Sequence, residues 1–599
     1  MNQKPKEKII YFIRPLWKNI SSKRKREVII SLQLIILNGI LDLISITSIL
    51  PLLYLLSAEK QSIMDKFFVK IIINIFNISN YDQILIFSAI SFGFVAIFSG
   101  LIRLYSLYFN TKLSGKIASE LSTNAFSKVI NQSYSYHVNL NSSEIITSIT
   151  TYVNVLNSGL ISLMQFITGL VLSSFIVIGT LFINWKLSLY GLIIYSSLYV
   201  LIAIYGKDRL NKNSKIVANS NIRVVKGIQE SLGSIRDIIL DDLHDYYISS
   251  HRKIEFFSRK LIAQNHFITF FPRYALETIT LVLISLIILF RSAIFGESEA
   301  IVPTLGALGI GMQKLLPSFQ SLYTSWASLN SQKSSIFKFI KFLELQNKKQ
   351  SFQNNQIIKI KDNRNISDFE YLKLSNVSFK YENQEDYIFK SLNLEIKKGE
   401  RIGIIGKTGD GKSTLLDILM GLIEPNSGKF IVNGRDLNRE NRYLNLWRKQ
   451  ISHVPQNIYL LDKTIIENIV LRDEQENINF ERVSNAVKLA QIDDFIFNSP
   501  FKYETLVGER GLKISGGQKQ RIGIARALYN IPNILILDEA TSALDEETEK
   551  LIMESITEIN KKMTIIIVAH RLKTMKYCDR VIKLRKGKIV FDGKPSEII

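Results

Sequence analysis

Long apolar stretches alternate with long polar stretches over the first half of the chain. About 20 consecutive apolar residues are needed to cross a bilayer as a helix. Six stretches are long enough, at about 28–56, 84–109, 159–183, 187–205, 270–290 and 302–325. In the second half, short β-branched runs alternate with charged, helically patterned segments, which is typical of an α/β domain. The pattern therefore predicts an α-helical membrane domain of six spans followed by an α/β domain.

The polar stretches between the spans are very unequal in length. Residues 110–158 and 206–269 are too long for turns and are helically patterned, so we expect helices that continue out of the membrane. The short break at 184–186 predicts a tight hairpin between the third and fourth spans. Residues 64–76 are amphipathic but too short to span, and they are expected to form an interfacial helix on the outer face. The polar stretch 341–368 is the predicted linker between a membrane domain at 1–340 and a second domain at 369–599.

Charge sharpens the membrane prediction. The net charge of +22 is compatible with nucleic-acid binding, but no nucleic-acid-binding module is recognisable, so none is expected as a partner. Basic residues instead flank the spans, at 23–26 before the first and at Lys207, Arg209, Lys212 and Lys215 after the fourth. Such clusters mark cytoplasmic loops. They predict a multi-pass protein of a bacterial inner membrane with both termini in the cytoplasm. The N-terminal segment lacks the cleavage site of a signal peptide.

The segment RIGIIGKTGDGKSTLLDIL at 401–419 reads as strand, glycine-rich loop and helix. Glycines allow backbone N–H groups to turn towards phosphate oxygens, and a helix start favours anions. Lys412 is expected to pair with the β- and γ-phosphates, and the Ser413 hydroxyl with Mg²⁺. The predicted nucleotide-binding residues of this loop are Gly406, Lys407, Thr408, Gly409, Asp410, Gly411, Lys412, Ser413 and Thr414.

Two further segments complete a nucleotide site. NILILDEATSALD at 533–545 is an apolar strand that ends in two carboxylates, Asp538 for Mg²⁺ and Glu539 for the attacking water. KISGGQKQRIGIARAL at 513–528 opens a second helix that can bind an anion. Its first residues, Ser515, Gly516, Gly517 and Gln518, are predicted to contact nucleotide. The single cysteine, Cys578, excludes a disulfide framework and a cysteine-based metal site.

Two phosphate-binding helix starts in one chain resemble the ATP-binding cassette (ABC) family, and further motifs match position by position. The resemblance implies that Tyr381 stacks on adenine, that Gln456 senses Mg²⁺ and γ-phosphate, and that His570 contacts the γ-phosphate. It implies ATP and Mg²⁺ as cofactors, with Ser413, Gln456 and Asp538 around the metal, and Glu539, His570 and Gln456 as the catalytic set. Residues 505–511 resemble the segment that touches the membrane domain, and 542–545 the loop after the catalytic carboxylates. Ile514 replaces the usual leucine.

One block of six spans followed by one cassette resembles an exporter half-transporter of the type IV ABC exporter fold. In that layout each nucleotide lies between the phosphate loop of one chain and the signature helix of another. The resemblance therefore implies that two chains complete the ATP sites, and since Glu539, Ser515 and His570 are all present, it implies a homodimer with two hydrolytic sites.

Charged residues in or beside the spans are the candidates for substrate binding. A lysine at the centre of a span costs about 2.5–3.5 kcal/mol on insertion scales, so Lys314 in the sixth span is expected to be functional. Arg103 in the second span and Arg273 in the fifth could join it around an anionic group. Arg273 could instead pair with Glu277 four residues on, and Arg103 could extend to the headgroups. Asp42 is the acidic residue of the first span.

PRYALE at 272–277, KLLP at 314–317 and the amphipathic segment 64–76 resemble the lipid-linked oligosaccharide flippase branch of the exporters. The resemblance implies that a polyprenyl-pyrophosphate-linked glycan moves from the cytoplasmic to the outer leaflet, with Arg103, Arg273 and Lys314 as headgroup ligands. Two alternatives stay open, a general lipid or multidrug exporter and a peptide exporter. The latter is less favoured because no cysteine protease precedes the first span.

Overall fold

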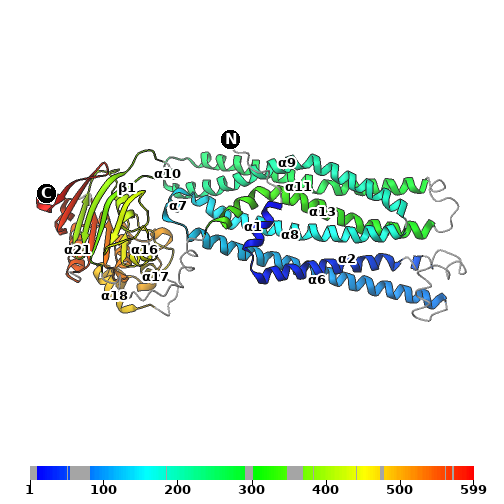
Figure 1. Cartoon of the computed structure of the whole chain (residues 1–599), viewed down its shortest axis with the longest axis horizontal. Helices are drawn as coiled ribbons and strands as arrows, with labels where there is room; N and C mark the ends of the chain where they lie inside the picture. Colours follow the sequence, from blue (N-terminus) through cyan, green and yellow to red (C-terminus); the bar gives the residue numbers. More distant parts are fainter. Residues whose placement is uncertain are drawn as a thin grey trace. The chain divides into compact units, whose positions relative to one another are not determined.

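A computed structural model describes 10–49, 52–53, 55, 81–183, 185–289, 301–346, 369–381, 384–439, 441–471, 478–559, 562–569 and 572–598 (Figure 1). It divides into two units. A membrane unit comprises Met1–Gln132 and Asn139–Asn347, and a cassette unit comprises Ser133–Val138 and Lys348–Ile599. The predicted interfacial helix at 64–76 and most of the predicted linker lie outside the described residues.

The membrane unit consists of helices. Each of the six predicted spans begins on a long helix, although the first was predicted to reach about residue 56 and its helix ends at Thr47; the polar extensions are helical as expected. These are α2 (Ser22–Thr47), α6 (Tyr81–Ile130), α8 (Ser142–Ile183), α9 (Trp185–Gly233), α11 (His244–Leu289) and α13 (Ile301–Glu344). Two shorter helices are α1 (Ile10–Asn19) and α10 (Ile235–Leu240). Among the described residues, α2, α6, α8 and α9 are long and apolar enough to cross a membrane.

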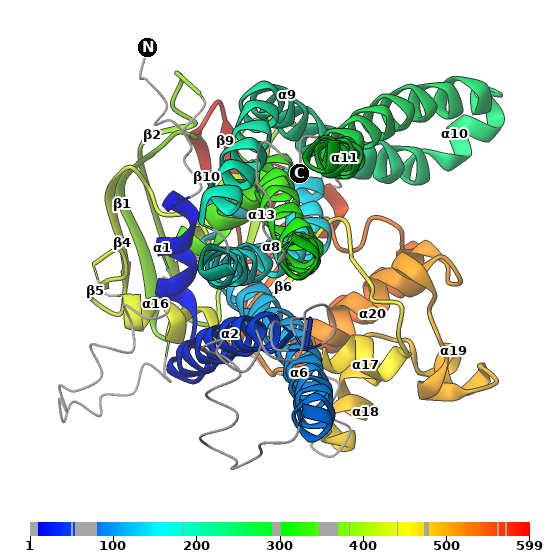
Figure 2. The ribbon, with the colours of Figure 1, turned by 90° about the vertical axis from the view of Figure 1, so that its right-hand side faces the viewer.

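Small residues let the long helices approach closely. Helix α8 packs against α13, α2, α9 and α6 (Figure 2). A Cβ placed on Gly169 of α8 would lie 3.1 Å from the Ser318 carbonyl oxygen of α13, and one on Gly39 of α2 would collide with the Phe175 ring of α8. Close backbone approach at glycine is the usual way in which membrane helices gain packing energy, because lipid and side chains are equally apolar.

The C-terminal part of α9 and the N-terminal part of α11, joined by α10, project sideways from the other helices of this unit (Figure 2). This projecting hairpin lies outside the predicted spans, yet it carries exposed apolar side chains. They are Leu232, Ile235, Ile239, Leu240 and Tyr246, between 45% and 81% exposed. An exposed apolar patch of this kind is typical of a protein-interaction surface.

The cassette unit contains two sheets. A six-stranded sheet has the order β10-β9-β3-β8-β7-β6, parallel except for the β9–β10 pair. Its strands are β3 (Arg401–Ile405), β6 (Ile451–Val454), β7 (Ile534–Asp538), β8 (Thr564–Val568), β9 (Arg580–Arg585) and β10 (Lys588–Gly593). An antiparallel sheet has the order β2-β1-β4-β5. Its strands are β1 (Tyr371–Phe379), β2 (Phe389–Lys397), β4 (Ser427–Val432) and β5 (Arg435–Asp436).

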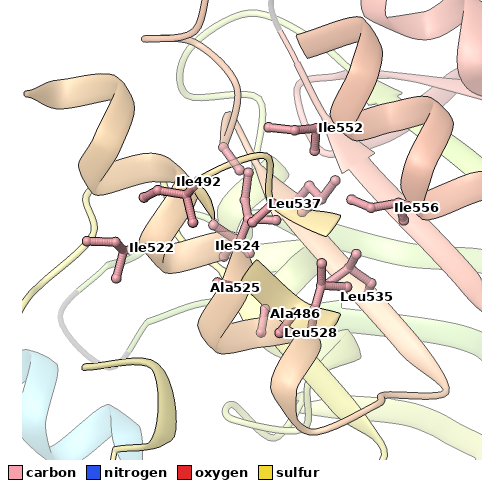
Figure 3. Packing of buried hydrophobic residues seen from close by; sticks show 14 of the residues in the cluster. Ala486, Ile492, Ile522, Ile524, Ala525, Leu528, Leu535, Leu537, Ile552 and Ile556 are labelled. Carbon is pink, nitrogen blue, oxygen red and sulfur yellow. The ribbon is translucent and has the colours of Figure 1, made fainter. Parts of the chain in front are cut away.

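Helices cover the larger sheet, as expected for parallel strands that are apolar on both faces. The helices of this unit are α15 (Lys412–Leu419), α16 (Asn441–Arg448), α17 (Ile465–Val470), α18 (Phe480–Leu489), α19 (Asp493–Asn498), α20 (Gly516–Tyr529) and α21 (Glu546–Ile559). Helix α20 packs against β6, and α17 and α18 pack against α20. Short 3₁₀ turns lie at 502–504, 509–511, 572–577 and 595–597. Figure 3 shows Ile524 and Leu528 of α20 beside Leu535 and Leu537 of β7, all buried. This core holds the strand ends that carry the site.

Helix α7 (Tyr134–Asn139) lies between α6 and α8 in sequence, yet Ser133–Val138 belongs to the cassette unit. Burial raises the pKa of the Tyr134 hydroxyl, and the Asp417 carboxyl of α15 raises it further. The segment 133–138 is thus grouped with the cassette, although the chain on either side of it belongs to the membrane unit.

Candidate nucleotide site and membrane cavities

The phosphate loop has the shape that its glycines predict. Gly409 and Gly411 have φ values of 88° and 96°, in the left-handed region that other residues avoid. A Cβ on Gly411 would also lie 3.0 Å from Ile388 and Phe389 of the neighbouring segment. The Lys412 ammonium donates to the carbonyl oxygens of Gly406 at 2.8 Å and Lys407 at 3.1 Å. The lysine is thus folded over its own loop, where a phosphate would meet it.

Asp410 has a role that its position in the motif does not reveal. Its carboxylate accepts from the backbone N–H of Lys407 at 2.6 Å and from that of Lys586, in the β9–β10 turn, at 2.9 Å. These bonds hold the pKa of Asp410 below its usual value, with Lys586 the larger cause. Because bonding favours the charged form, it stabilises the loop at neutral pH and is lost as pH falls through the lowered pKa. Asp410 therefore joins the phosphate loop to the turn.

Tyr381 follows β1 beside the phosphate loop. Its hydroxyl lies 3.4 Å from the hydroxyl of Thr414, and its ring packs edge-on against Phe379, with ring centroids 5.0 Å apart. The half-buried ring is thereby fixed near the first turn of α15. This placement allows an adenine to stack on it while the phosphates reach the loop.

The two carboxylates at the end of β7 are separated by a change of backbone direction. Asp538 is the last residue of the strand, and Glu539 has a φ of 50°. Such a conformation in a residue other than glycine costs about 1–3 kcal/mol and is found mostly at functional sites. The Glu539 N–H donates to the Val568 carbonyl at 2.9 Å. Its carboxylate accepts from Gln456 Nε2 at 2.6 Å, so two predicted catalytic residues are in direct contact.

The signature segment forms a capped helix start. Ser515 Oγ accepts from the Gln518 N–H at 3.2 Å, and the Ser515 N–H donates to Gln518 Oε1 at 2.9 Å, which is a capping box. Ser515 and Gly516 are exposed, as are Lys407, Thr408 and Gly409 of the phosphate loop. Both anion-binding elements of this chain therefore face outwards, where the complementary element of another chain could meet each of them.

Gln520 was not singled out by the sequence, although it organises the same region. Its Nε2 donates to Ser542 Oγ at 3.1 Å, and its Oε1 accepts from the Ala543 N–H at 2.9 Å. The side chain is buried and joins α20 to the loop after Glu539. A glutamine inside a helix gives no sequence signal of such a role, because its partners are more than 20 residues away.

The donor set suits a hard divalent cation. Ser413, Asp538 and the Gln456 carbonyl oxygen offer oxygen ligands, and Mg²⁺ usually keeps several waters besides one or two protein ligands. Gln456 can donate through Nε2 to Glu539 and still ligate through Oε1. Among the described residues no group of three His, Cys, Asp or Glu side chains could hold a metal. His570 lies outside the described residues.

The three predicted substrate cations differ in their surroundings. Lys314 Nζ lies 3.1 Å from Asp42 Oδ1 and 3.1 Å from Ser45 Oγ, both on α2. The Asp42 side chain is only 8% exposed and also accepts from Ser99 of α6 at 3.2 Å. Arg273 Nε pairs with Glu277 at 2.8 Å, the i, i+4 pairing considered from the sequence. Arg103 is exposed and has no acidic partner among the described residues.

Arg103 also lines a cavity of about 480 Å³ between α2, α6, α8 and α13. Its other walls include Asn38, Gln165, Pro317 and Ser318. Lys314 and Arg273 are not among the lining residues. Of the three cations, the described part of the chain therefore places Arg103 alone in the wall of this cavity.

Comparison with known proteins agrees with the geometry. The family description for the ABC transporter transmembrane region matches residues 47–253, and that for the ABC transporter matches residues 389–542. Together they cover more than half of the chain, in the order that the spans and the phosphate loop predict.

The chain belongs to the ABC transporter family. Its nucleotide-binding domain is of the ATP-hydrolysing kind. A solved bacterial Atm1-family ABC exporter with ATP bound has a TM-score of 0.76 over 96% of both chains at 21% identity, which shows the shared type IV exporter fold. The chain is thus an exporter half-transporter by architecture, as predicted.

Curated relatives share only part of the chain. The leukotoxin translocation ATP-binding protein LktB of Pasteurella haemolytica-like sp. (strain 5943B) is 46% identical over 228 residues, 38% of this chain and 32% of that protein. LktB of Mannheimia haemolytica is 46% identical over 229 residues, with the same coverage. The matched segment thus covers about a third of the length of each of these relatives.

Proposed function

We propose that two copies of this chain form an ATP-driven exporter for a lipid-linked, anionic glycan, most simply a polyprenyl-pyrophosphate oligosaccharide. The glycan would move from the cytoplasmic to the outer leaflet of a bacterial inner membrane. The observation that carries this proposal is Arg103, a cation in a predicted span that lines a cavity without an acidic partner among the described residues.

An arginine in a span is costly unless its charge is used. Asn38 also lines the Arg103 cavity, and its buried Oδ1 has no hydrogen-bond partner among the described residues; as an acceptor it suits a hydroxyl or N–H of the ligand rather than a phosphate oxygen. A guanidinium binds phosphate oxygens through two parallel N–H donors. Much of the remaining lining is apolar, including Leu104, Ile161 and Leu172. This combination suits an amphiphile with a phosphate group.

Lys314 and Arg273 are each paired with a carboxylate, which favours a structural role for them over direct contact with substrate. The Lys314–Asp42 pair joins α13 to α2 and contributes no net charge to an anion site. Arg273 shares its charge with Glu277 on the surface of α11. We propose that Arg103 provides the main headgroup contact, while Lys314 holds the helices around it.

A homodimer is proposed on two grounds. The exposed phosphate loop and the exposed signature helix are each half of an ATP site, and a second copy supplies both missing halves. The projecting hairpin of α9, α10 and α11 carries exposed apolar side chains outside the predicted spans, which a second copy would cover. Self-complementary association of two copies is the commonest form of soluble oligomer.

The proposed cycle follows from the positions of the side chains. Lys412 and the loop N–H groups bind phosphate oxygens, Tyr381 stacks on adenine, and Ser413, Asp538 and Gln456 would hold Mg²⁺, which offsets negative charge as the γ-phosphate leaves. Glu539, positioned by Gln456, orients and deprotonates the attacking water, and His570 would contact the γ-phosphate. Opening and closing of the two cassettes would pass through the long helical extensions and switch the cavity between its inward and outward faces, as the resemblance to exporters implies.

The proposal is tested by reconstituting the full chain in proteoliposomes with a fluorescent polyprenyl-pyrophosphate glycan. ATP-dependent movement between leaflets is expected in wild type and is expected to disappear in Arg103→Gln. The control is Arg14→Gln, at an exposed position of α1 away from the cavity. If the labelled glycan stays in its leaflet while ordinary phospholipids or dyes move, the general lipid or multidrug exporter replaces this proposal.

A protein exporter is the second candidate, because the named relatives translocate a leukotoxin. The sequence identity spans 228 residues, so it supports a shared function for the matched part of the chain only. An unfolded polypeptide that stimulates ATP turnover in the same proteoliposomes, in place of the lipid, would favour this candidate.

A further inference from the structure

A second cavity in the membrane unit has a different chemistry from that of Arg103. It encloses about 470 Å³ between α8, α9, α11 and α13. Eleven of its 16 lining residues carry a hydroxyl or a side-chain amide, and no Asp, Glu, Lys or Arg is among them. A cavity so rich in neutral donors and acceptors is suited to a neutral ligand with many hydrogen-bonding groups.

Some of the polar atoms in its wall are unused. Ser325 is only 1% exposed, and its Oγ has no hydrogen-bond partner among the described residues. Gln332 donates through Nε2 to Ser328 Oγ at 3.1 Å, while its buried Oε1 has no partner among them. Leaving buried polar atoms unpaired costs about 1–3 kcal/mol each. Both residues line the cavity, but their unpaired oxygens are closed to solvent, so a ligand would pair with them only after the Ser325 or Gln332 side chain rotates towards the cavity.

The two cavities follow one another along the same helices. On α13 the Arg103 cavity is lined by Pro317, Ser318 and Ser321, and the neutral cavity by residues from Thr324 to Ser335. On α8 the two cavities follow one another in the same direction relative to the extensions, and Gln165 lines both cavities. The neutral cavity is therefore nearer the helical extensions, which the charge pattern places in the cytoplasm. Ser321 lines the Arg103 cavity and Ser331 lines the neutral cavity; ten residues apart on α13, they are separated by about 15 Å along the helix.

We propose that this neutral cavity binds the first sugars of the substrate, while the anionic group contacts Arg103 on the other side of Gln165. The inference rests on the proposed function. A lipid-linked glycan carries its groups in this order, since the tail lies in the bilayer, the phosphates follow, and the sugars point to the cytoplasm. The stacked rings of His266 and Phe270, with centroids 5.9 Å apart, add a flat apolar surface for the C–H face of a sugar.

The test uses the full-length protein in nanodiscs and two probes, polyprenyl pyrophosphate bearing an N-acetylated disaccharide and the same lipid without sugar. Binding of each labelled lipid and its stimulation of ATP turnover are measured. In wild type, the disaccharide is expected to lower the half-maximal lipid concentration. In Ser325→Ala and in Gln332→Leu this concentration is expected to rise about 3- to 10-fold, as for a lost hydrogen bond. The sugar-free lipid should bind all three proteins alike.

Ser88→Ala is the matched control. Ser88 of α6 is also 1% exposed with an unpartnered hydroxyl among the described residues, and it lines neither cavity. It should respond to both lipids as wild type does. Ser325→Ala removes no hydrogen bond within the described residues, so it is not expected to impair folding.

The outcomes separate the two proposals. If the sugar-free lipid stimulates through Arg103 and the disaccharide adds nothing, this inference is overturned while the anion site stands. If the advantage of the disaccharide survives in both cavity variants, the sugars bind elsewhere. If neither lipid binds, both proposals fail. Displacement of the disaccharide lipid by an unfolded peptide would assign the cavity to peptide amides and overturn the sugar assignment.

Discussion

The cassette unit and the membrane unit both contain charged residues that the sequence singles out, but only in the cassette does a local motif determine the surroundings. Lys412, Asp410 and the loop glycines are within six residues of one another, and the strand-loop-helix geometry brings them together. Lys314 and Asp42 are 272 residues apart, and only helix packing brings them together. Charge in a span therefore indicates a partner without saying whether that partner is substrate or protein.

The largest expected effect tests the cassette side of this comparison. Glu539→Gln removes the base beside Gln456 and keeps the shape of the side chain, so turnover of ATP is expected to fall about 10²- to 10⁴-fold while ATP binding persists. Phosphate release and nucleotide binding are measured on the full chain. Glu481→Gln, an exposed position of α18, is the control. Normal turnover in Glu539→Gln would show that another group activates water.

On the membrane side, Lys314→Met leaves the Asp42 carboxylate buried without its cation. Breaking a buried pair costs about 3–5 kcal/mol, and we expect roughly 2–3 kcal/mol here because the Lys314 side chain is 30% exposed. The thermal unfolding midpoint should drop, and the double variant Asp42→Asn with Lys314→Met should recover most of the loss.

Arg273→Met is the matched control for that experiment. Its pair with Glu277 is 51% and 42% exposed, so the unfolding midpoint is expected to change little or not at all. An equal drop in both single variants, or no recovery in the double variant, would contradict a structural role for Lys314.

A smaller effect concerns pH in the cassette. Burial lowers the pKa of His453 in β6 from 6.5 to about 4, and its Nε2 is buried without a partner among the described residues. The unfolded chain gains a proton as pH falls below 6.5, whereas the folded chain does not, so stability falls between pH 6.5 and 4. Relative to wild type, His453→Leu should lose about 2 kcal/mol less between pH 7.5 and pH 5.

The measurement for His453 is the unfolding midpoint at the two pH values, with the exposed His251→Leu as control. Identical pH dependence in wild type and His453→Leu would mean that His453 is protonated in the folded protein. The result bears on the comparison of the two units, because His453 lies three residues before Gln456. Its protonation reports whether the end of β6 that positions Gln456 is closed to water.

The smallest expected effect is at Asp410. Asparagine offers one acceptor oxygen in place of two, so Asp410→Asn keeps the bond from either Lys407 or Lys586 but not both. The KM for ATP is expected to rise about 3- to 10-fold with a smaller change in kcat. Asp386→Asn, at an exposed position, is the control. A change in kcat at constant KM would instead show that Asp410 takes part in the chemical step and does not merely position the loop.

Much of this protein could be predicted because the decisive signals are local. The glycines of the phosphate loop, the apolar strand before Asp538 and the Ser515 capping box each fit within a few residues of sequence. The apolar runs likewise predicted the helices, including the extensions beyond the spans. The roles of Asp410, Gln520 and Lys314 could not be predicted, because each depends on a partner brought near by the fold.

The central claim is that Arg103 serves substrate and Lys314 serves structure. It is tested most directly by the stimulation of ATP turnover in nanodiscs by a polyprenyl-pyrophosphate glycan. The proteins compared are wild type, Arg103→Gln, and the double variant Asp42→Asn with Lys314→Met. The account predicts that stimulation is lost in Arg103→Gln and retained in the double variant. Stimulation that survives Arg103→Gln and disappears in the double variant would contradict it.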